Sequence, residues 1–100
     1  MTAGSWLSFG EANGLLVYYT QLMTYRCAIR DMRIGIDSTV PNKVVPLGDC
    51  DPKHPYEIPP KAVPYMRLPA TTRMVSVELT YRDGSVSETK TFKKASHMIQ

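Results

Sequence analysis

The chain has 100 residues, of which 43% are hydrophobic and 21% charged, and its formal net charge at pH 7 is +3. A chain of this length forms one domain with a modest core and has no room for a deep active-site cleft with a separate lid. A nucleic-acid-binding domain of this size usually carries a denser basic stripe, and no run of about 18 apolar residues is present. We therefore expect neither a nucleic-acid partner nor a transmembrane helix. The first residues also lack the basic and apolar regions of a signal peptide.

The N-terminal third of the sequence fits two kinds of secondary structure. Ser8 followed by Glu11 matches a helix capping box, and apolar residues recur at helical spacing farther on. Against this, Val, Thr, Tyr and Ile dominate residues 15–29, and Gly10 and Gly14 would weaken a first helical turn. We predict a strand over residues 15–29, and the choice between helix and strand stays open for residues 8–23.

A second strand is expected over residues 32–36. The inward apolar positions change from odd to even numbers near Arg30 and Asp31, which indicates one inserted residue, such as a β-bulge. Gly35 lies between two inward isoleucines, where its missing side chain leaves space for a neighbouring group. Residues 37–39, with the sequence Asp-Ser-Thr, are expected to end this strand as a turn.

The segment from Pro41 to Pro69 contains all eight prolines of the chain. Proline fixes φ and removes a backbone donor, so this segment predicts an extended connection with edge strands and no helix. Short strands are expected around residues 44–45 and 65–68. A long irregular connection in a small domain is usually either functional or tied down by other contacts.

The C-terminal part predicts a β-hairpin. Apolar residues alternate with polar ones from Val75 to Tyr81, which is typical of a strand with one buried face. Asp83-Gly84 then matches a two-residue type I′ turn. Counting outward from this turn pairs Arg82 with Ser85, Tyr81 with Val86, Leu79 with Glu88, and Val75 with Phe92. In this register Val75, Val77, Leu79, Tyr81 and Val86 face the core.

The last six residues include Ser-His-Met, which is typical of residues left by cloning. We therefore predict a single domain over residues 1–94 and a disordered or cloning-derived tail over 95–100. His97 is left out of the search for a site.

Cys27 and Cys50 are the only cysteines. An even count in a small β domain favours a disulfide, which would fasten the proline-rich connection to the sheet and contribute about 3 kcal/mol through chain entropy. The alternative is two reduced cysteines, one of them buried. A bridged pair would favour a periplasmic or extracellular location.

The sequence offers little for metal binding or catalysis. Cys50 and His54 have a spacing that metal sites use, but a structural zinc ion needs four ligands, and only Cys27 could be added. The same two residues lack a group that would orient them as a thiol–imidazole pair. We expect no metal, no cofactor and no enzymatic activity, and a small enzyme with a reactive cysteine remains an alternative.

Two groups of residues are binding candidates. Arg26, Arg30 and Arg33 share one exposed face on either a helix or a strand, and such a face could bind an anionic partner, nucleic acid or an acidic surface. Aromatic side chains could contact carbohydrate or peptide, above all Tyr56 and Tyr65 in the proline-rich connection. The wider aromatic set is Trp6, Phe9, Tyr18, Tyr56 and Tyr65.

A strand that ends in a turn with proline at residues 32–41, a long crossing, and the hairpin over 75–92 resemble immunoglobulin-like or fibronectin-type-III-like modules. The resemblance covers about the last two-thirds of the chain. The chain lacks the core tryptophan and the inter-sheet cysteine spacing of true immunoglobulin domains. The resemblance implies an antiparallel β-sandwich, and it implies no activity. We predict an all-β, immunoglobulin-like sandwich that acts as a non-catalytic accessory module of an exported bacterial protein and binds protein or glycan.

Overall fold

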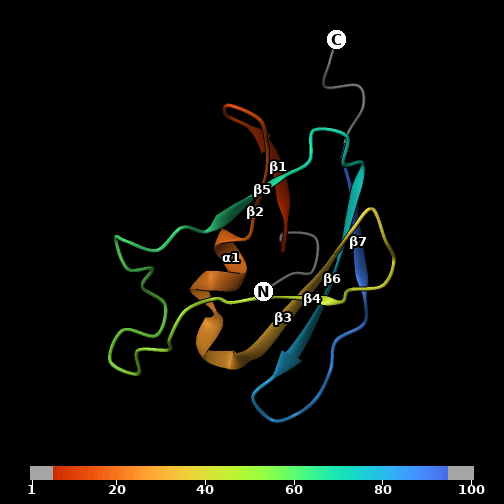
Figure 1. The fold of residues 1–100 in the computed structure, drawn as a ribbon. Coiled ribbons are helices and arrows are strands. Elements are labelled where there is room, and N and C mark those ends of the chain that lie inside the picture. Colours follow the sequence, from red (N-terminus) through yellow and green to blue (C-terminus); the bar gives the residue numbers. More distant parts are fainter. Residues whose placement is uncertain (1–5, 95–100) are drawn as a thin grey trace.

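The computed structural model describes residues 6–94, so the tail predicted over 95–100 lies outside the described residues. The fold is nearly all-β and consists of two antiparallel sheets with a short helix at one side (Figure 1). This confirms the predicted all-β, antiparallel class. No helix within residues 6–94 is long and apolar enough to cross a membrane.

The two sheets have three and four strands. The smaller sheet has the order β1-β2-β5, with β1 at Ser8–Glu11, β2 at Leu15–Tyr18 and β5 at Tyr65–Leu68. The larger sheet has the order β4-β3-β6-β7, with β3 at Ile29–Ile36, β4 at Lys43–Val45, β6 at Met74–Tyr81 and β7 at Lys90–Lys93. Strands β4 and β5 confirm the two short strands predicted within the proline-rich connection.

The predicted strand over residues 15–29 is wrong beyond Tyr18. Helix α1 occupies Thr20–Thr24, and a 3₁₀ turn follows at Arg26–Ala28. These residues carry the chain from the smaller sheet to the larger one, and a straight strand could not make that crossing. Leu22 and Met23 of α1 are 0% and 4% exposed and belong to the core. Burying each such side chain contributes about 1.5–3 kcal/mol, which outweighs the β propensity of the segment.

The core fills the space between the sheets. The smaller sheet contributes Leu15, Val17 and Leu68, and the larger sheet contributes alternate residues of β3 and β6. The latter are Met32, Ile34, Val75, Val77 and Leu79, all at most 2% exposed. The register between β3 and β6 shifts between Ile29 and Asp31, which confirms the bulge predicted from the change of parity.

The loop after β3 folds back over Gly35. Asp37, at a φ of 52°, accepts hydrogen bonds through Oδ1 from the backbone N–H groups of Arg73 and Met74 at 2.8 and 3.1 Å. A Cβ at Gly35 would collide with the Val40 carbonyl oxygen and would lie 2.6 Å from Ser76 Oγ. The space expected at Gly35 is therefore filled by the returning loop.

The turn of the C-terminal hairpin differs from the predicted two-residue type I′ turn. Tyr81 N–H donates to Ser85 O at 2.8 Å and Gly84 N–H donates to Tyr81 O at 3.0 Å, which encloses a three-residue loop. Gly84 has a φ of 91°, whereas Asp83 keeps a negative φ. Three-residue hairpin loops place a residue in this left-handed conformation, and glycine adopts it without strain.

The longer loop shifts the first pairs of the hairpin by one residue. Val86 pairs with Thr80 instead of Tyr81, so its side chain leaves the core face and is 57% exposed. Leu79 meets Ser87 instead of Glu88: its N–H donates to Ser87 Oγ at 2.9 Å, and Ser87 N–H donates to Leu79 O at 2.8 Å.

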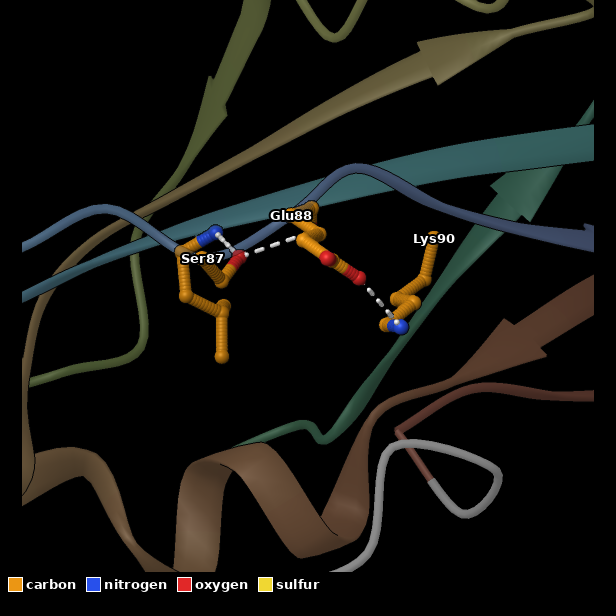
Figure 2. Close-up of polar contacts among 4 residues, drawn as sticks. Ser87, Glu88 and Lys90 are labelled. Atoms are coloured by element: carbon orange, nitrogen blue, oxygen red, sulfur yellow. Dashed lines mark hydrogen bonds and ion pairs between the residues drawn. The ribbon is translucent and has the colours of Figure 1, made fainter.

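One extra residue on the returning chain then restores the predicted register. Glu88 and Thr89 together span the place opposite Glu78, and Val75 pairs with Phe92 as predicted. Figure 2 shows Ser87 and Glu88 at this irregular segment, with the Glu88 carboxylate 3.0 Å from Lys90 Nζ. The far end of the hairpin therefore follows the sequence pattern, and the end near the turn does not.

Candidate recognition surfaces

The disulfide between Cys27 and Cys50 is present and links the 3₁₀ turn to the proline-rich connection. Arg26 reinforces this link from the preceding position. Its Nε donates to the carbonyl oxygen of Asp49 at 2.6 Å, and one Nη donates to the carbonyl oxygen of Met23 at 3.1 Å. The proline-rich connection is therefore fastened at two consecutive residues, Asp49 by the hydrogen bond from Arg26 and Cys50 by the disulfide.

The predicted face of three arginines does not form. Arg26 is 3% exposed because the 3₁₀ turn directs it inward. Arg30 is exposed and lies 3.4 Å from the carboxylate of Asp31, while Arg33 lies on the middle of β3 opposite Glu78. The expectation of a shared face rested on one continuous helix or strand, and the chain changes conformation between these positions.

A shallow groove of about 270 Å³ lies where the chain after β4 leaves β3. It is lined by aliphatic residues together with four charged residues, Arg30, Asp31, Asp49 and Arg82. Two basic and two acidic side chains offset one another, and the Arg30 guanidinium is already paired with Asp31. The groove therefore lacks the excess of positive charge that an anion site needs.

The clearest aromatic surface is on the outer face of the smaller sheet. Tyr18 of β2 and Tyr65 of β5 are directly paired across the strands, and their ring centroids lie 5.4 Å apart at an interplanar angle of 52°. Tyr65 is 39% exposed and Tyr18 is partly exposed. Side chains on this face alternate with the core residues of the same strands, so the rings point away from the core.

Neighbouring residues fix the position of this ring pair. The Tyr18 ring extends over Gly10 of β1, where a Cβ would come within 2.8 Å of it. Arg67, on the same face of β5, donates through Nη1 to the carbonyl oxygens of Ala12 and Asn13 at 3.4 and 2.6 Å. We call Tyr18, Tyr65 and Arg67 together the tyrosine platform.

The other aromatic candidates have different surroundings. Tyr56 is 65% exposed and packs edge-on against Tyr25 at 5.6 Å between centroids, so it stands on the proline-rich connection outside the platform. Trp6 is buried in the core at 5% exposure and is unsuited to binding. Tyr19 is also buried: its hydroxyl donates to the carbonyl oxygen of Tyr65 at 3.3 Å, and burial raises the pKa of that hydroxyl above its ordinary value of 10.0.

The residues considered for metal binding and catalysis lie apart or are already used. Within residues 6–94, no three His, Cys, Asp or Glu side chains gather as metal ligands would. His54 is exposed, and its nearest carboxylate is that of Glu57 at 3.9 Å. Cys50 is bridged to Cys27, so the thiol needed for a reactive-cysteine enzyme is absent while the bridge is intact.

Tyr65 and Tyr18 were both aromatic candidates in the sequence, but no local pattern joined them. Their pairing depends on contact between strands β2 and β5, which are far apart in the sequence. Arg67 had no local signal at all. Comparisons of this chain with protein-family models, with curated proteins and with solved structures find no match.

Proposed function

We propose that this chain is a non-catalytic recognition module that binds a glycan on the tyrosine platform. The observation that carries this proposal is the cross-strand pair of rings at Tyr18, which is partly exposed, and Tyr65, which is exposed. An aromatic ring offers an apolar face to the C–H groups of a sugar, and the phenol hydroxyl can both donate and accept hydrogen bonds. Tyrosine also loses little conformational entropy when it is immobilised, because it has only two side-chain torsions.

Arg67 adds polar recognition beside the rings. A guanidinium has five N–H donors, and within the described residues only its Nη1 makes hydrogen bonds. The remaining donors can bind sugar hydroxyls or a carboxylate. The bonds to Ala12 and Asn13 already hold the guanidinium. Binding of a ligand would therefore cost less side-chain conformational entropy at Arg67.

The shape of the platform supports a chain-like ligand over a small enclosed one. The groove near Arg30 belongs to the other sheet, and the platform itself lies on an open sheet face. Pockets for small molecules enclose most of the ligand surface, whereas an open face can accept a segment of a longer polymer. The immunoglobulin-like assignment remains part of the proposal and is supported by two antiparallel sheets around one core.

The disulfide supports an oxidising location for this module. Bridges between cysteines persist in extracellular and periplasmic compartments and are rare in the cytosol. Extracellular and cell-surface glycans would be accessible to a protein there.

A glycan array followed by calorimetric titration of the best glycan tests the proposal. We expect Tyr65→Ala to weaken binding by at least about tenfold, since exposed aromatic residues at binding surfaces contribute 1 kcal/mol or more. Arg67→Ala should weaken it less. Tyr56→Ala is the matched control, because Tyr56 is an exposed tyrosine outside the platform; its affinity should equal that of the wild type.

Four results would count against the proposal. Absence of binding to every glycan class on the array would reject the ligand. Unchanged affinity of Tyr65→Ala would reject the platform as its site. Hydrolysis of the bound glycan would reject the non-catalytic assignment, and a protein partner whose binding depends on Tyr65 would replace the glycan.

A further inference from the structure

The tyrosine platform carries a positive charge and no carboxylate. Strands β1, β2 and β5 contain two charged residues, Glu11 and Arg67. Glu11 pairs with Leu15, a core residue, so its side chain belongs to the inner side of the sheet. Arg67 pairs with Leu16, which alternates with the core residues of β2, so it lies on the outer side with the two rings. Arg67 is therefore the one charged residue that these strands place on the outer face.

The charge of Arg67 is not compensated by a neighbouring carboxylate. None of the ion pairs within residues 6–94 includes Arg67. Its hydrogen-bond acceptors are the carbonyl oxygens of Ala12 and Asn13, which carry no net charge. An anion beside this exposed guanidinium would gain electrostatic attraction without having to displace a carboxylate of the protein.

The donors that Arg67 leaves unused match a carboxylate group. Its Nη1 is directed at the turn between β1 and β2, where Asn13 O lies at 2.6 Å. The edge of the guanidinium that carries Nε and Nη2 makes no hydrogen bond within residues 6–94. Two parallel N–H groups on such an edge bind the two oxygens of a carboxylate at once, and these charge-assisted bonds are stronger than those to a neutral hydroxyl.

The guanidinium and the rings contact different parts of a ligand. Tyr65 and Arg67 are two residues apart on β5, which is about 7 Å at the usual rise of a strand. The bonds to Ala12 and Asn13 draw the guanidinium toward the β1–β2 turn, away from the rings. Leu16, next to Arg67 on β2, is 3% exposed and offers no contact between them. A ligand that reaches both must therefore extend beyond the sugar ring that stacks on a tyrosine.

We propose that the ligand of the tyrosine platform is an acidic oligosaccharide, with a carboxylate held by Arg67 and a neighbouring sugar unit stacked on Tyr65. This inference rests on the glycan-binding function proposed above and adds the chemical class of the glycan. Arg67 is then the residue that selects acidic glycans over neutral ones. Two kinds of sugar supply the carboxylate, namely uronic acids within a polymer and sialic acids at a chain end.

Pairs of glycans that differ only in charge test this selectivity. The probes are oligogalacturonates and sialylated oligosaccharides, each titrated into the wild-type chain as the free acid and as its methyl ester. Esterification removes the negative charge and keeps the sugar rings. We expect the free acid of the bound kind to bind about three- to tenfold more tightly than its ester. Which of the two kinds binds identifies the source of the carboxylate.

Variants of the chain assign the selectivity to one residue. Arg67→Gln should lower the affinity for the free acid to that for the ester and should leave the affinity for the ester unchanged, because only the free acid uses the guanidinium. Tyr65→Ala should weaken both forms. Arg30→Gln is the matched control, since it removes an exposed arginine of the larger sheet, and it should keep the wild-type preference.

Equal affinity for acid and ester, with both dependent on Tyr65, would overturn the acidic class and leave the glycan platform intact. An acid preference that survives Arg67→Gln would overturn the role of Arg67, and so would a variant that weakens both forms equally, because that pattern indicates a structural effect. Tighter binding of sulfated than of carboxylated glycans would overturn the carboxylate. Absence of binding to every glycan would remove this inference together with the proposed function.

Discussion

The Arg26 guanidinium donates to the carbonyl oxygen of Asp49 at 2.6 Å, next to the disulfide that joins Cys27 to Cys50. Two neighbouring residues of the 3₁₀ turn are therefore fastened to two neighbouring residues of the proline-rich connection, one pair by a hydrogen bond and the other by a covalent bond. Since prolines deprive the connection of backbone donors, these side-chain links replace the ladder that would hold a strand.

Replacing Arg26 should destabilise the fold strongly. Arg26→Ala removes a buried cation together with both of its hydrogen bonds and leaves two carbonyl oxygens without that donor. We expect the free energy of unfolding to fall by about 2–4 kcal/mol, measured by urea denaturation. Arg30→Ala removes an exposed arginine and should change it by less than about 0.5 kcal/mol. Equal effects of the two variants would contradict the structural role of Arg26.

Removing the disulfide should lower the free energy of unfolding without unfolding the domain. Cys27→Ala with Cys50→Ala opens a loop with a sequence separation of 23 residues, and we expect a loss of about 3 kcal/mol in the free energy of unfolding. A reductant should lower the stability of the wild type by a similar amount. It should leave the double variant unchanged, and a further loss there would show that the reductant acts elsewhere.

Gly35→Ala should destabilise the fold through steric conflict. The added methyl group would meet the Val40 carbonyl oxygen, which belongs to the backbone and can move only with its loop. We expect a loss of about 1–3 kcal/mol, measured as a lower denaturation midpoint. Adding Ser76→Ala removes one of the close atoms but leaves the loop in place, so it should not restore stability. Full recovery in the double variant would identify the Ser76 hydroxyl as the main obstacle.

Tyr19 should make stability depend on pH in the alkaline range. Because burial raises the pKa of this hydroxyl in the folded state, folding favours the protonated form. Its contribution is fully present below pH 10.0, the unfolded value, and is lost as the pH rises through the higher folded value. Tyr19→Phe should remove this part of the pH dependence. It should also cost about 1 kcal/mol at neutral pH through the lost hydrogen bond to Tyr65. Denaturation at several pH values compares the two proteins, and parallel alkaline curves would refute the assignment to Tyr19.

The hairpin shows how far sequence patterns reach. Alternation from Val75 to Tyr81 correctly predicted strand β6 and the burial of Val75, Val77 and Leu79. It did not predict that Ser76 and Thr80, on the opposite face of the strand, are buried as well. The pairing of Val75 with Phe92 was also correct. The turn type was wrong because Asp-Gly is compatible with both a two-residue and a three-residue loop. The bulge at Glu88 and Thr89 then compensated for the extra residue, and no local signal marks it.

The tyrosine platform was less accessible to sequence reasoning. Tyr65 was a candidate, but its contact with Tyr18 depends on pairing between β2 and β5. The predicted arginine face failed because it required Arg26 and Arg33 to share one regular element. Which side chains meet across strands depends on register and on chain crossings, and neither is encoded within a short window of sequence.

The sequence by itself determined the all-β class, the bulge near Arg30 and the irregular course of the proline-rich connection, and it favoured the pairing of the two cysteines over two reduced thiols. Each follows from local rules, namely the period of apolar residues, the missing donors of proline, and an even cysteine count. The tertiary structure alone decided that residues 20–28 form a helix and a 3₁₀ turn, and that Arg26 lies inside. The physical reason is that the chain must cross between two sheets there, and burial of Leu22 and Met23 in the shared core outweighs the strand preference of the segment.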